Sequence, residues 1–588
     1  MSTVFGSDSS LSLRPITGLS GQVDLIAVSQ QIPIFELFLF FVVVGSLYVV
    51  YRLDTPRGAW GATLRSRLLF GVPWGTIVSM ALVIGVYLFI QGGIHNRYAP
   101  TVIPFRAWSY LDPFPVVVSG FAHANYGHLR GNMIGTLALA PLAEFAFGHY
   151  TDKRGESTFS SLRTNPYIRA FVLFPLGVIA IGILTGVFSL GPSIGFSGVV
   201  YAFAGFALVY YPIATVVALT ARQVISGLNN ALANPVQFAA AEATYSTPWF
   251  AGIAVQGHAI GLLLGVVAGV ALMWYRNDNP PTALRLWTGA LLYAVSQSLW
   301  AIYWYRGGEQ YVLYRGLGLA LVFILATIIA AAVVSRDRPL FPTRVVPNPT
   351  TTFESLTSGT TQQVAFVVLL VAVASLLGPT IPISLNTADQ SDLPGDPIEI
   401  DGYEITYGED VPDGMIGVVD IDAFGESTQV NTSGVIVRNT DRHIWTTATT
   451  RGRLAFDGRA AIRVGGVGWQ ETVIAEREGW RAANSGTAYR VSLRYAGEER
   501  TQFVSDPVTA EPTIAGQNIT VGVVEDVFVV ATDVDGDVAT EEIPAENETA
   551  ALAGLQIENV ENVLFAVDEE TETRVRVAEK ERYGNGQR

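Results

Sequence analysis

The sequence contains no cysteine, and only two of its 588 residues are lysine. Without cysteine the chain forms no disulfide, zinc–thiolate or iron–sulfur site, and a covalent nucleophile must be a hydroxyl, a lysine or a carboxylate. Charged residues are also scarce, at 15% against about 25% in an average soluble domain. Half of the chain is hydrophobic. This composition predicts a membrane protein.

The charge is divided unevenly along the chain. From Asn386 to the C-terminus there are 38 acids and 16 lysines or arginines, a net charge of −22. The first 385 residues hold the other 13 acids and 20 basic residues, a net charge of +7. The acidic part would repel phosphate, which argues against nucleic-acid binding. An acidic, lysine-poor surface suits a halophile, although a GC-rich genome would also favour arginine.

Apolar runs long enough to cross a bilayer recur through the first part. A further weakly apolar span is expected within 212–250, where Pro212 could divide the preceding run, which predicts about ten spans in all. The clear runs lie at 34–51, 70–92, 126–148, 167–190, 197–220, 251–275, 284–304, 311–334 and 364–384.

Basic residues predict the orientation of these spans. Arginine or lysine is concentrated in the loops 52–69, 149–166 and 335–363, which should therefore be cytoplasmic. Everything after Leu385 then lies outside the cell, and this is a multi-pass protein of the cell membrane. That tail holds three glycosylation sequons, and its Val- and Ile-rich runs with Asp-Gly turns predict a β-sandwich or small barrel. The final 40 residues are expected to add a strand pair.

A serine stands at the start of one of the apolar runs, in the motif GFSG from Gly195 to Gly198. A serine hydroxyl needs a base to become a nucleophile, and histidine is the usual base. His258 begins another apolar run and is followed by Gly261 and Gly265. Small residues at this spacing allow two helices to pack closely. We therefore expect Ser197 and His258 to meet near the outer ends of their helices.

A further pair of polar residues, four positions apart, lies on one expected helix. His128 and Asn132 share a face of that helix and could donate hydrogen bonds to an oxyanion, together with the backbone N–H of Ser197. No acid is available in the sequence to orient His258, so the arrangement predicts a Ser-His dyad. His123 precedes this helix and could line the same cavity.

At these residues the sequence resembles the rhomboid family of intramembrane serine proteases, over roughly residues 70–275. The resemblance implies Ser197 as nucleophile, His258 as general base, and Asn132 and His128 as oxyanion donors. It also implies that His123 supports the cavity, that Tyr201 stacks on the catalytic histidine, and that Glu144 is a structural acid at the inner end of its helix. The motifs that carry the resemblance are GFSG with VVYAF, His123-x4-His128-x3-Asn132, and His258-x2-Gly261-x3-Gly265.

The resemblance implies an all-α polytopic bundle whose six-helix core, 70–275, cleaves transmembrane proteins near the outer membrane face without cofactor or metal. The Trp-Arg pair common in the family's outer loop is not at its usual place; the nearest candidates are Arg106 and Trp108. Outside the resemblance lie an N-terminal segment with one extra helix (1–69), three additional helices (276–385) and the acidic extracellular β domain (386–588). The expected partners are transmembrane substrates and the bilayer, with the β domain a candidate for binding a further ligand.

Other interpretations remain open from the residues alone. The chain could be a catalytically silent relative that binds and escorts membrane proteins, although such a protein has no need of both Ser197 and His258. A transporter would also have intramembrane polar residues, but no inverted repeat is visible. His128 and Asn132 could serve only as contacts between helices. His95, His149 and His443 are most simply interfacial or surface residues.

Overall fold

A computed structural model describes residues 33–54, 58–150, 156–236, 243–335, 360–416, 430–534 and 536–584. These residues divide into two compact units. The helical unit lies within Met1–Ala240, Pro248–Tyr303 and Leu313–Ser384, and the β unit within Ala241–Thr247, Trp304–Val312 and Leu385–Arg588. Arg57, Lys153, Arg154 and the arginines of the 335–363 loop, which helped to predict the orientation, lie outside the described residues.

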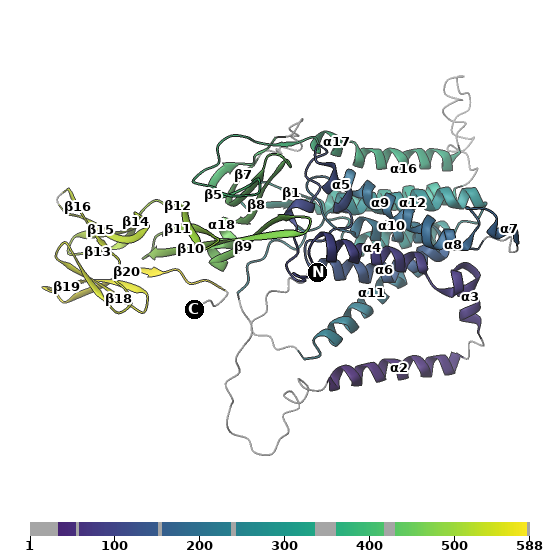
Figure 1. Ribbon diagram of the computed structural model, residues 1–588, viewed down its shortest axis with the longest axis horizontal. Helices are drawn as coiled ribbons and strands as arrows, with labels where there is room; N and C mark the ends of the chain where they lie inside the picture. The colour runs from purple at the N-terminus through teal and green to yellow at the C-terminus, as the bar shows by residue number, and fades with distance from the viewer. Residues whose placement is uncertain are drawn as a thin grey trace, which may run out of the picture. The chain divides into compact units, whose positions relative to one another are not determined.

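The helical unit contains long apolar helices that run alongside one another (Figure 1). Its larger helices are α2 (Ile34–Asp54), α4 (Trp74–Gly85), α6 (Tyr126–Phe147), α9 (Phe174–Val187), α10 (Ser197–Tyr210), α11 (Pro212–Ala233), α12 (Val255–Arg276), α13 (Ala283–Ser296), α14 (Arg315–Val334) and α16 (Thr361–Leu377). Its short elements are α3 (Ala59–Arg67), η1 (Leu69–Gly71), η2 (Val86–Ile90), η3 (Ile103–Phe105), α5 (Pro113–Ser119), α7 (Glu156–Phe159), α8 (Pro166–Ile168), η4 (Arg169–Leu173) and α17 (Thr380–Ile383).

Among the described residues, five helical stretches are long and apolar enough to cross a membrane, which supports a multi-pass membrane protein. The stretches Trp74–Ile90 and Ser197–Tyr210 are apolar but shorter. The expectation of about ten spans is therefore met only in part, because α6, α11 and α13 form without reaching that length and hydropathy. The five stretches are Ile34–Leu53, Pro166–Val187, Val255–Arg276, Arg315–Val334 and Thr361–Ile383.

The apolar run 197–220 is not one helix, so its interpretation as a single span was wrong. The chain leaves the helical conformation at Tyr211, with φ −135° and ψ 62°, and α11 begins at Pro212. Proline has no backbone N–H, and its ring disfavours the helical conformation of the residue before it. Helix α10 therefore has 14 residues, about 21 Å of rise. This short helix begins at Ser197.

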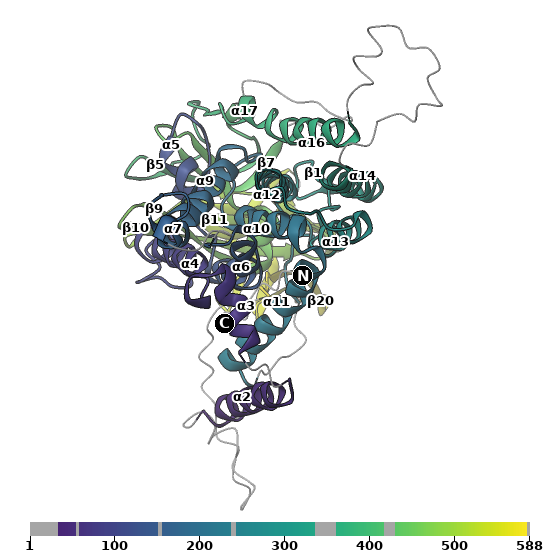
Figure 2. The same ribbon diagram turned by 90° about the vertical axis from the view of Figure 1, so that its right-hand side faces the viewer.

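Helix α10 lies at the centre of the helical unit, with α12, α6, α11 and α13 around it (Figure 2). Most of its residues from Gly198 to Val209 are buried. A helix that is apolar on every side is expected to be surrounded by other helices. The core cluster of the unit accordingly includes Val199, Phe203 and Leu208.

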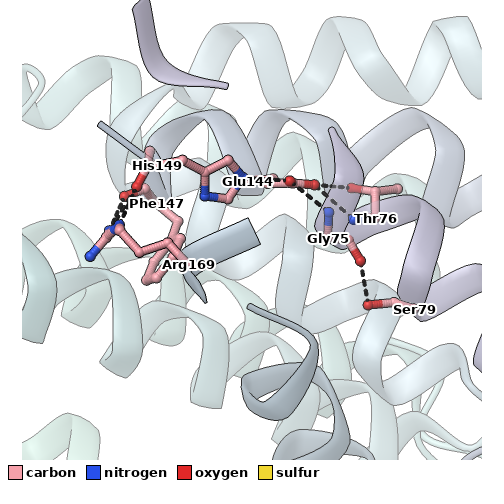
Figure 3. A network of polar contacts seen from close by, with 8 residues as sticks. Gly75, Thr76, Ser79, Glu144, Phe147, His149 and Arg169 are labelled. Atoms are coloured by element: carbon pink, nitrogen blue, oxygen red, sulfur yellow. Dashed lines mark hydrogen bonds and ion pairs between the residues drawn. The ribbon is translucent and has the colours of Figure 1, made fainter. Parts of the chain in front are cut away.

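The C-terminal end of α6 is joined to the start of α4 by a buried carboxylate (Figure 3). Glu144 accepts hydrogen bonds from the backbone N–H of Gly75 at 2.8 Å and of Thr76 at 2.7 Å, and from the Thr76 hydroxyl at 2.7 Å. The first N–H groups of a helix have no partner within the helix, so Glu144 supplies the acceptors that α4 lacks. Glu144 is thus a buried structural acid near the C-terminal end of α6.

His149 is not a surface residue, contrary to its expected place. Its side chain is fully buried, and Nε2 lies 2.6 Å from the Glu144 carboxylate. Arg169 next to it donates to the carbonyl oxygens of Phe147 and Gly148 at the C-terminal end of α6, where carbonyl oxygens have no donor within the helix (Figure 3). A histidine at the polar end of a span is thus part of the core when a buried acid faces it.

The second unit is all-β, as the tail composition predicts. An eight-stranded sheet runs β12-β11-β10-β20-β19-β18-β17, with β9 beside β10; two four-stranded sheets run β13-β14-β15-β16 and β4-β5-β7-β8. The strands are β3 (Thr387–Ala388), β4 (Ile398–Ile400), β5 (Tyr403–Pro412), β6 (Met415–Ile416), β7 (Asn431–Asn439), β8 (Ile444–Thr450), β9 (Arg459–Gly466), β10 (Trp469–Ala482), β11 (Thr487–Tyr495), β12 (Glu498–Val504), β13 (Val508–Ile514), β14 (Gln517–Val524), β15 (Val527–Val534), β16 (Asp537–Glu542), β17 (Thr549–Leu552), β18 (Leu555–Val560), β19 (Val563–Asp568) and β20 (Thr573–Lys580), with one helix, α18 (Arg451–Asp457).

The final 40 residues hold more than the expected strand pair, because β17 to β20 all lie there and complete the large sheet. Alternate residues of β18 are buried, as expected for a strand with one face on a core. The β unit also includes β1 (Tyr303–Tyr305) from Trp304 onward and most of β2 (Tyr311–Leu313). Within this unit, Glu309 accepts hydrogen bonds from the hydroxyls of Tyr245 and Thr450.

The Glu144 contacts generate a stability prediction. Glu144→Ala should lower the free energy of unfolding by about 3 kcal/mol, because it leaves buried backbone N–H groups of α4 without acceptors. Thermal unfolding of the purified protein in detergent measures this as a lower Tm. Glu144→Gln, which keeps one acceptor oxygen, should lose less. An alanine variant as stable as the wild type would contradict the role given to this carboxylate.

Candidate active site

Ser197 and His258 lie within hydrogen-bond distance, although 61 positions separate them in the chain. Ser197 is the first residue of α10, and His258 lies in the first turn of α12. The distance from His258 Nε2 to Ser197 Oγ is 2.9 Å. An imidazole nitrogen at this distance can accept the hydroxyl proton.

Glycines bring the two helices together. A Cβ atom at Gly261 would lie 2.0 Å from the carbonyl oxygen of Gly198, and one at Gly265 would lie 2.1 Å from that of Ala202. The reverse holds at Gly205, where a Cβ would lie 2.0 Å from the carbonyl oxygen of Leu262. No side chain fits in these places, so α10 and α12 pack backbone against backbone. This confirms the close packing expected from the glycine spacing.

Tyr201 lies one turn below Ser197, and its ring is stacked on His258. The ring centroids are 4.2 Å apart and the planes differ by 8°. His258 Nδ1 has no hydrogen-bond partner among the described residues. The imidazole is therefore oriented by its bond to Ser197 on one edge and by the aromatic face of Tyr201, with no carboxylate against it.

His123, His128 and Asn132 lie close to one another, and His128 contacts Gly195, two residues before Ser197. The Asn132 amide nitrogen lies 3.0 Å from His123 Nε2, and the rings of His123 and His128 are 5.1 Å apart. An amide NH₂ only donates, so His123 Nε2 is the acceptor. An amide NH₂ carries two hydrogens, so the bond to His123 uses only one of them.

Gly195 allows His128 to reach the loop before Ser197. A Cβ at Gly195 would lie 2.5 Å from His128 Cε1, and its φ of +137° is rarely adopted by other residues. The side chain of Asn125 accepts the backbone N–H of His128 and so begins helix α6 there. The first residue of the GFSG motif is therefore glycine because a side chain there would clash with His128.

Gln91 is a residue of this site that the sequence reasoning missed. Its amide accepts the backbone N–H of His123 at 2.7 Å and donates to the carbonyl oxygens of His123 at 2.8 Å and Thr101 at 2.9 Å. It is fully buried and holds His123 in place. The only sequence signal was a lone glutamine at the end of an apolar run.

Arg106 and Trp108 belong to a loop that contacts the segment before Ser197. Arg106 donates to the carbonyl oxygen of Pro192 at 3.2 Å, and the backbone N–H of Ala107 donates to Ser193 at 3.1 Å. Trp108 is buried and donates to the carbonyl oxygen of Ile103. The loop therefore packs on the segment that leads into the serine.

A small cavity of about 30 Å³ lies beside the serine and the imidazole. Space of this size holds one or two water molecules. Its walls are mostly small residues: Gly120, Thr185, Gly186, Ser189, Ser193, Ile194, Gly195, Ser197, Gly198, Ala254, Gly257 and His258. In the described part of the chain, no group of three or more His, Asp or Glu side chains is placed to hold a metal ion.

No family model matches this chain, and no curated protein or solved structure matches it either. The function is therefore inferred from the residues and geometry of the site itself.

The packing of α10 on α12 generates a prediction for Gly261→Ala. The added methyl group would force the helices apart, so the hydrogen bond from Ser197 to His258 should be lost and Tm should fall. Reaction of Ser197 with a fluorophosphonate probe should slow by on the order of 100-fold. Gly177→Ala on α9 is the matched control, because a Cβ there meets nothing within 4 Å. Equal labelling of the two variants would contradict the packing argument.

Proposed function

We propose that this protein is an intramembrane serine endopeptidase that cleaves transmembrane proteins near the outer membrane face. The observation that carries the proposal is the 2.9 Å distance between His258 Nε2 and Ser197 Oγ at the facing ends of two apolar helices. A binding protein needs no such pair, and a transporter would not need a histidine held against a serine by glycine packing.

The proposed reaction uses the residues as follows. Ser197 Oγ attacks the carbonyl carbon of the scissile bond while its proton passes to His258 Nε2. The Asn132 amide, His128 and the backbone N–H of Ser197 stabilise the negative charge on the carbonyl oxygen. His258 then gives the proton to the leaving amine, which leaves an ester on Ser197.

Water completes the reaction from the small cavity. His258 accepts a proton from a water molecule as that water attacks the ester, and the proton returns to Ser197 Oγ as the acid product leaves. The cavity beside the dyad is large enough to hold this water. No cofactor or metal takes part in the proposed mechanism.

The proposed catalytic core is a rhomboid-like six-helix bundle formed by α4, α6, α9, α10, α11 and α12. Support for it comes from the position of α10 among its neighbours (Figure 2). The site residues other than Gln91, which follows η2, come from the loop before α6, from α6, α10 and α12, and from the GFSG loop. The helices α2, α13, α14 and α16 lie outside this core in the sequence.

We further propose that the β unit is extracellular and positions substrates. Its charge supports this, because an acidic surface suits an aqueous compartment and the arginine-rich loops mark the opposite side.

The dyad is tested by two substitutions. Ser197→Ala and His258→Ala should each abolish cleavage of a reporter transmembrane substrate in proteoliposomes, and Ser197→Ala should also abolish labelling by a fluorophosphonate. The Tm of Ser197→Ala should stay close to that of the wild type, because the glycine contacts that pack α10 on α12 do not involve the serine hydroxyl. His258→Ala also removes the ring stacked on Tyr201, so its Tm should fall. Undiminished cleavage by the Ser197→Ala protein would remove the protease proposal.

The orientation can be tested because the chain has no cysteine. Val538 on β16 is 69% exposed and Leu162 in the 149–166 loop is 72% exposed. In intact cells a membrane-impermeant maleimide should label Val538→Cys and should label Leu162→Cys only after permeabilisation. Labelling of the loop variant alone in intact cells would reverse the orientation.

A further inference from the structure

Helix α13 contacts the aromatic ring that orients His258, although α13 lies outside the stretch that carries the proposed catalytic core. The Tyr201 hydroxyl donates to the backbone carbonyl oxygen of Gln297 at 3.1 Å. The ring of Tyr293 meets the Tyr201 ring edge-on, with centroids 5.7 Å apart and planes at 88°. Tyr201 is thus held between His258 on its face and α13 on its edge.

The end of α13 explains why this carbonyl is available. Gln297 is the residue that follows the last turn of α13, and the last carbonyl oxygens of a helix have no partner within it. The Tyr201 hydroxyl provides the missing donor. Tyr293 is buried, at 1% exposure, so its ring cannot leave the contact without opening the core.

The side chain of Gln297 has a separate partner. Arg222 on α11 donates to Gln297 Oε1 at 2.9 Å. No described acid forms an ion pair with Arg222, and a charge within a membrane span is costly unless it has a polar partner. The guanidinium also lies beside Gly135, one turn along α6 from Asn132. Gln297 therefore joins α11 and α10 to α13 at the level of the site.

We propose that Gln297 and Tyr293 are positioning residues for His258, and that α13 is a required part of the active site. This inference rests on the proposed protease function. His258 Nδ1 has no partner among the described residues, so the plane of the imidazole depends on Tyr201. Tyr201 in turn depends on α13 for its hydroxyl partner and for the ring at its edge. Arg222 and the Gln297 amide keep the end of α13 in register with α11.

The experiment compares full-length variants in proteoliposomes. Tyr201→Phe removes the hydroxyl but keeps the stacked ring, Tyr293→Leu removes the edge-on ring, and Gln297→Ala removes the acceptor for Arg222. Two variants keep the contacts: Tyr293→Phe retains the ring, and Gln297→Glu retains the acceptor oxygen. Leu292→Ala is the matched control on α13, because Leu292 is 49% exposed and faces away from the core.

Two kinetic measurements are made for each variant. The first is the labelling of Ser197 by a small fluorophosphonate, which needs the dyad but no substrate helix; the second is kcat and KM for a reporter transmembrane substrate. We expect Tyr201→Phe, Tyr293→Leu and Gln297→Ala to lower the labelling rate and kcat by about 10-fold with little change in KM, as for a small misplacement of the base. Tyr293→Phe, Gln297→Glu and Leu292→Ala should stay within about 2-fold of the wild type.

The outcomes separate this inference from the proposed function. A wild type with Ser197-dependent cleavage, together with unchanged labelling in the three disruptive variants, would overturn the role of α13 and leave the protease intact. A loss confined to KM would also overturn it, because α13 would then serve substrate binding. If the Tm of Tyr293→Leu shows that this variant does not fold, the labelling rates of Tyr201→Phe and Gln297→Ala decide whether α13 positions His258. A wild type without Ser197-dependent labelling or cleavage would overturn the proposed function itself.

Discussion

The contact between the backbones of α10 and α12 is the constraint on which the site depends. At Gly198, Gly261 and Gly265 the two helices touch with no side chain between them. The Ser197 hydroxyl and the His258 imidazole project from the facing ends of these helices, so their 2.9 Å separation follows from the approach of the helices themselves. Small residues give this approach inside a membrane, where the hydrophobic effect does not drive helices together.

Around this contact, a few polar residues form hydrogen bonds that hold the apolar helices and loops in position. Glu144 supplies acceptors for the first turn of α4 near the C-terminal end of α6, and Gln91 holds the backbone of His123 in the loop before α6. Gln297 is the third such residue: its backbone carbonyl accepts a hydrogen bond from Tyr201, and its side-chain amide oxygen accepts one from Arg222. Glu144 meets backbone N–H groups at the start of a helix, Gln91 meets the backbone of loops, and Gln297 meets a tyrosine hydroxyl and an arginine. The site is therefore supported by polar contacts at helix ends and in the loops beside them.

The two units differ in how they are stabilised. In the helical unit the backbone hydrogen bonds lie within helices, and the packing of α10 needs glycines. In the β unit the backbone bonds run between strands. Ion pairs add to them, such as the pair of Arg477 on β10 with Glu581 just after β20, in which both side chains are almost fully buried. Burial of the Tyr245 hydroxyl beside Glu309 raises the pKa of Tyr245 to about 12, so Tyr245 stays neutral and donates to Glu309. This arrangement fits the strong acid excess of the tail.

Ser197, His258, Asn132 and the glycine faces could be recognised from the sequence because each is an exception in an apolar run, and polarity in a span has few explanations. The division at Leu385 was also visible, since charge and hydropathy change together there. The break at Tyr211 was only suspected from Pro212, and the partners of His149 and Gln91 were not predicted. Those contacts join residues tens of positions apart, and a sequence does not state which helix end faces which side chain. The sequence by itself determined which groups could do chemistry and that they lie in apolar helices; only the tertiary structure decided that α13 lies against Tyr201, because that contact depends on how helices pack and not on local periodicity.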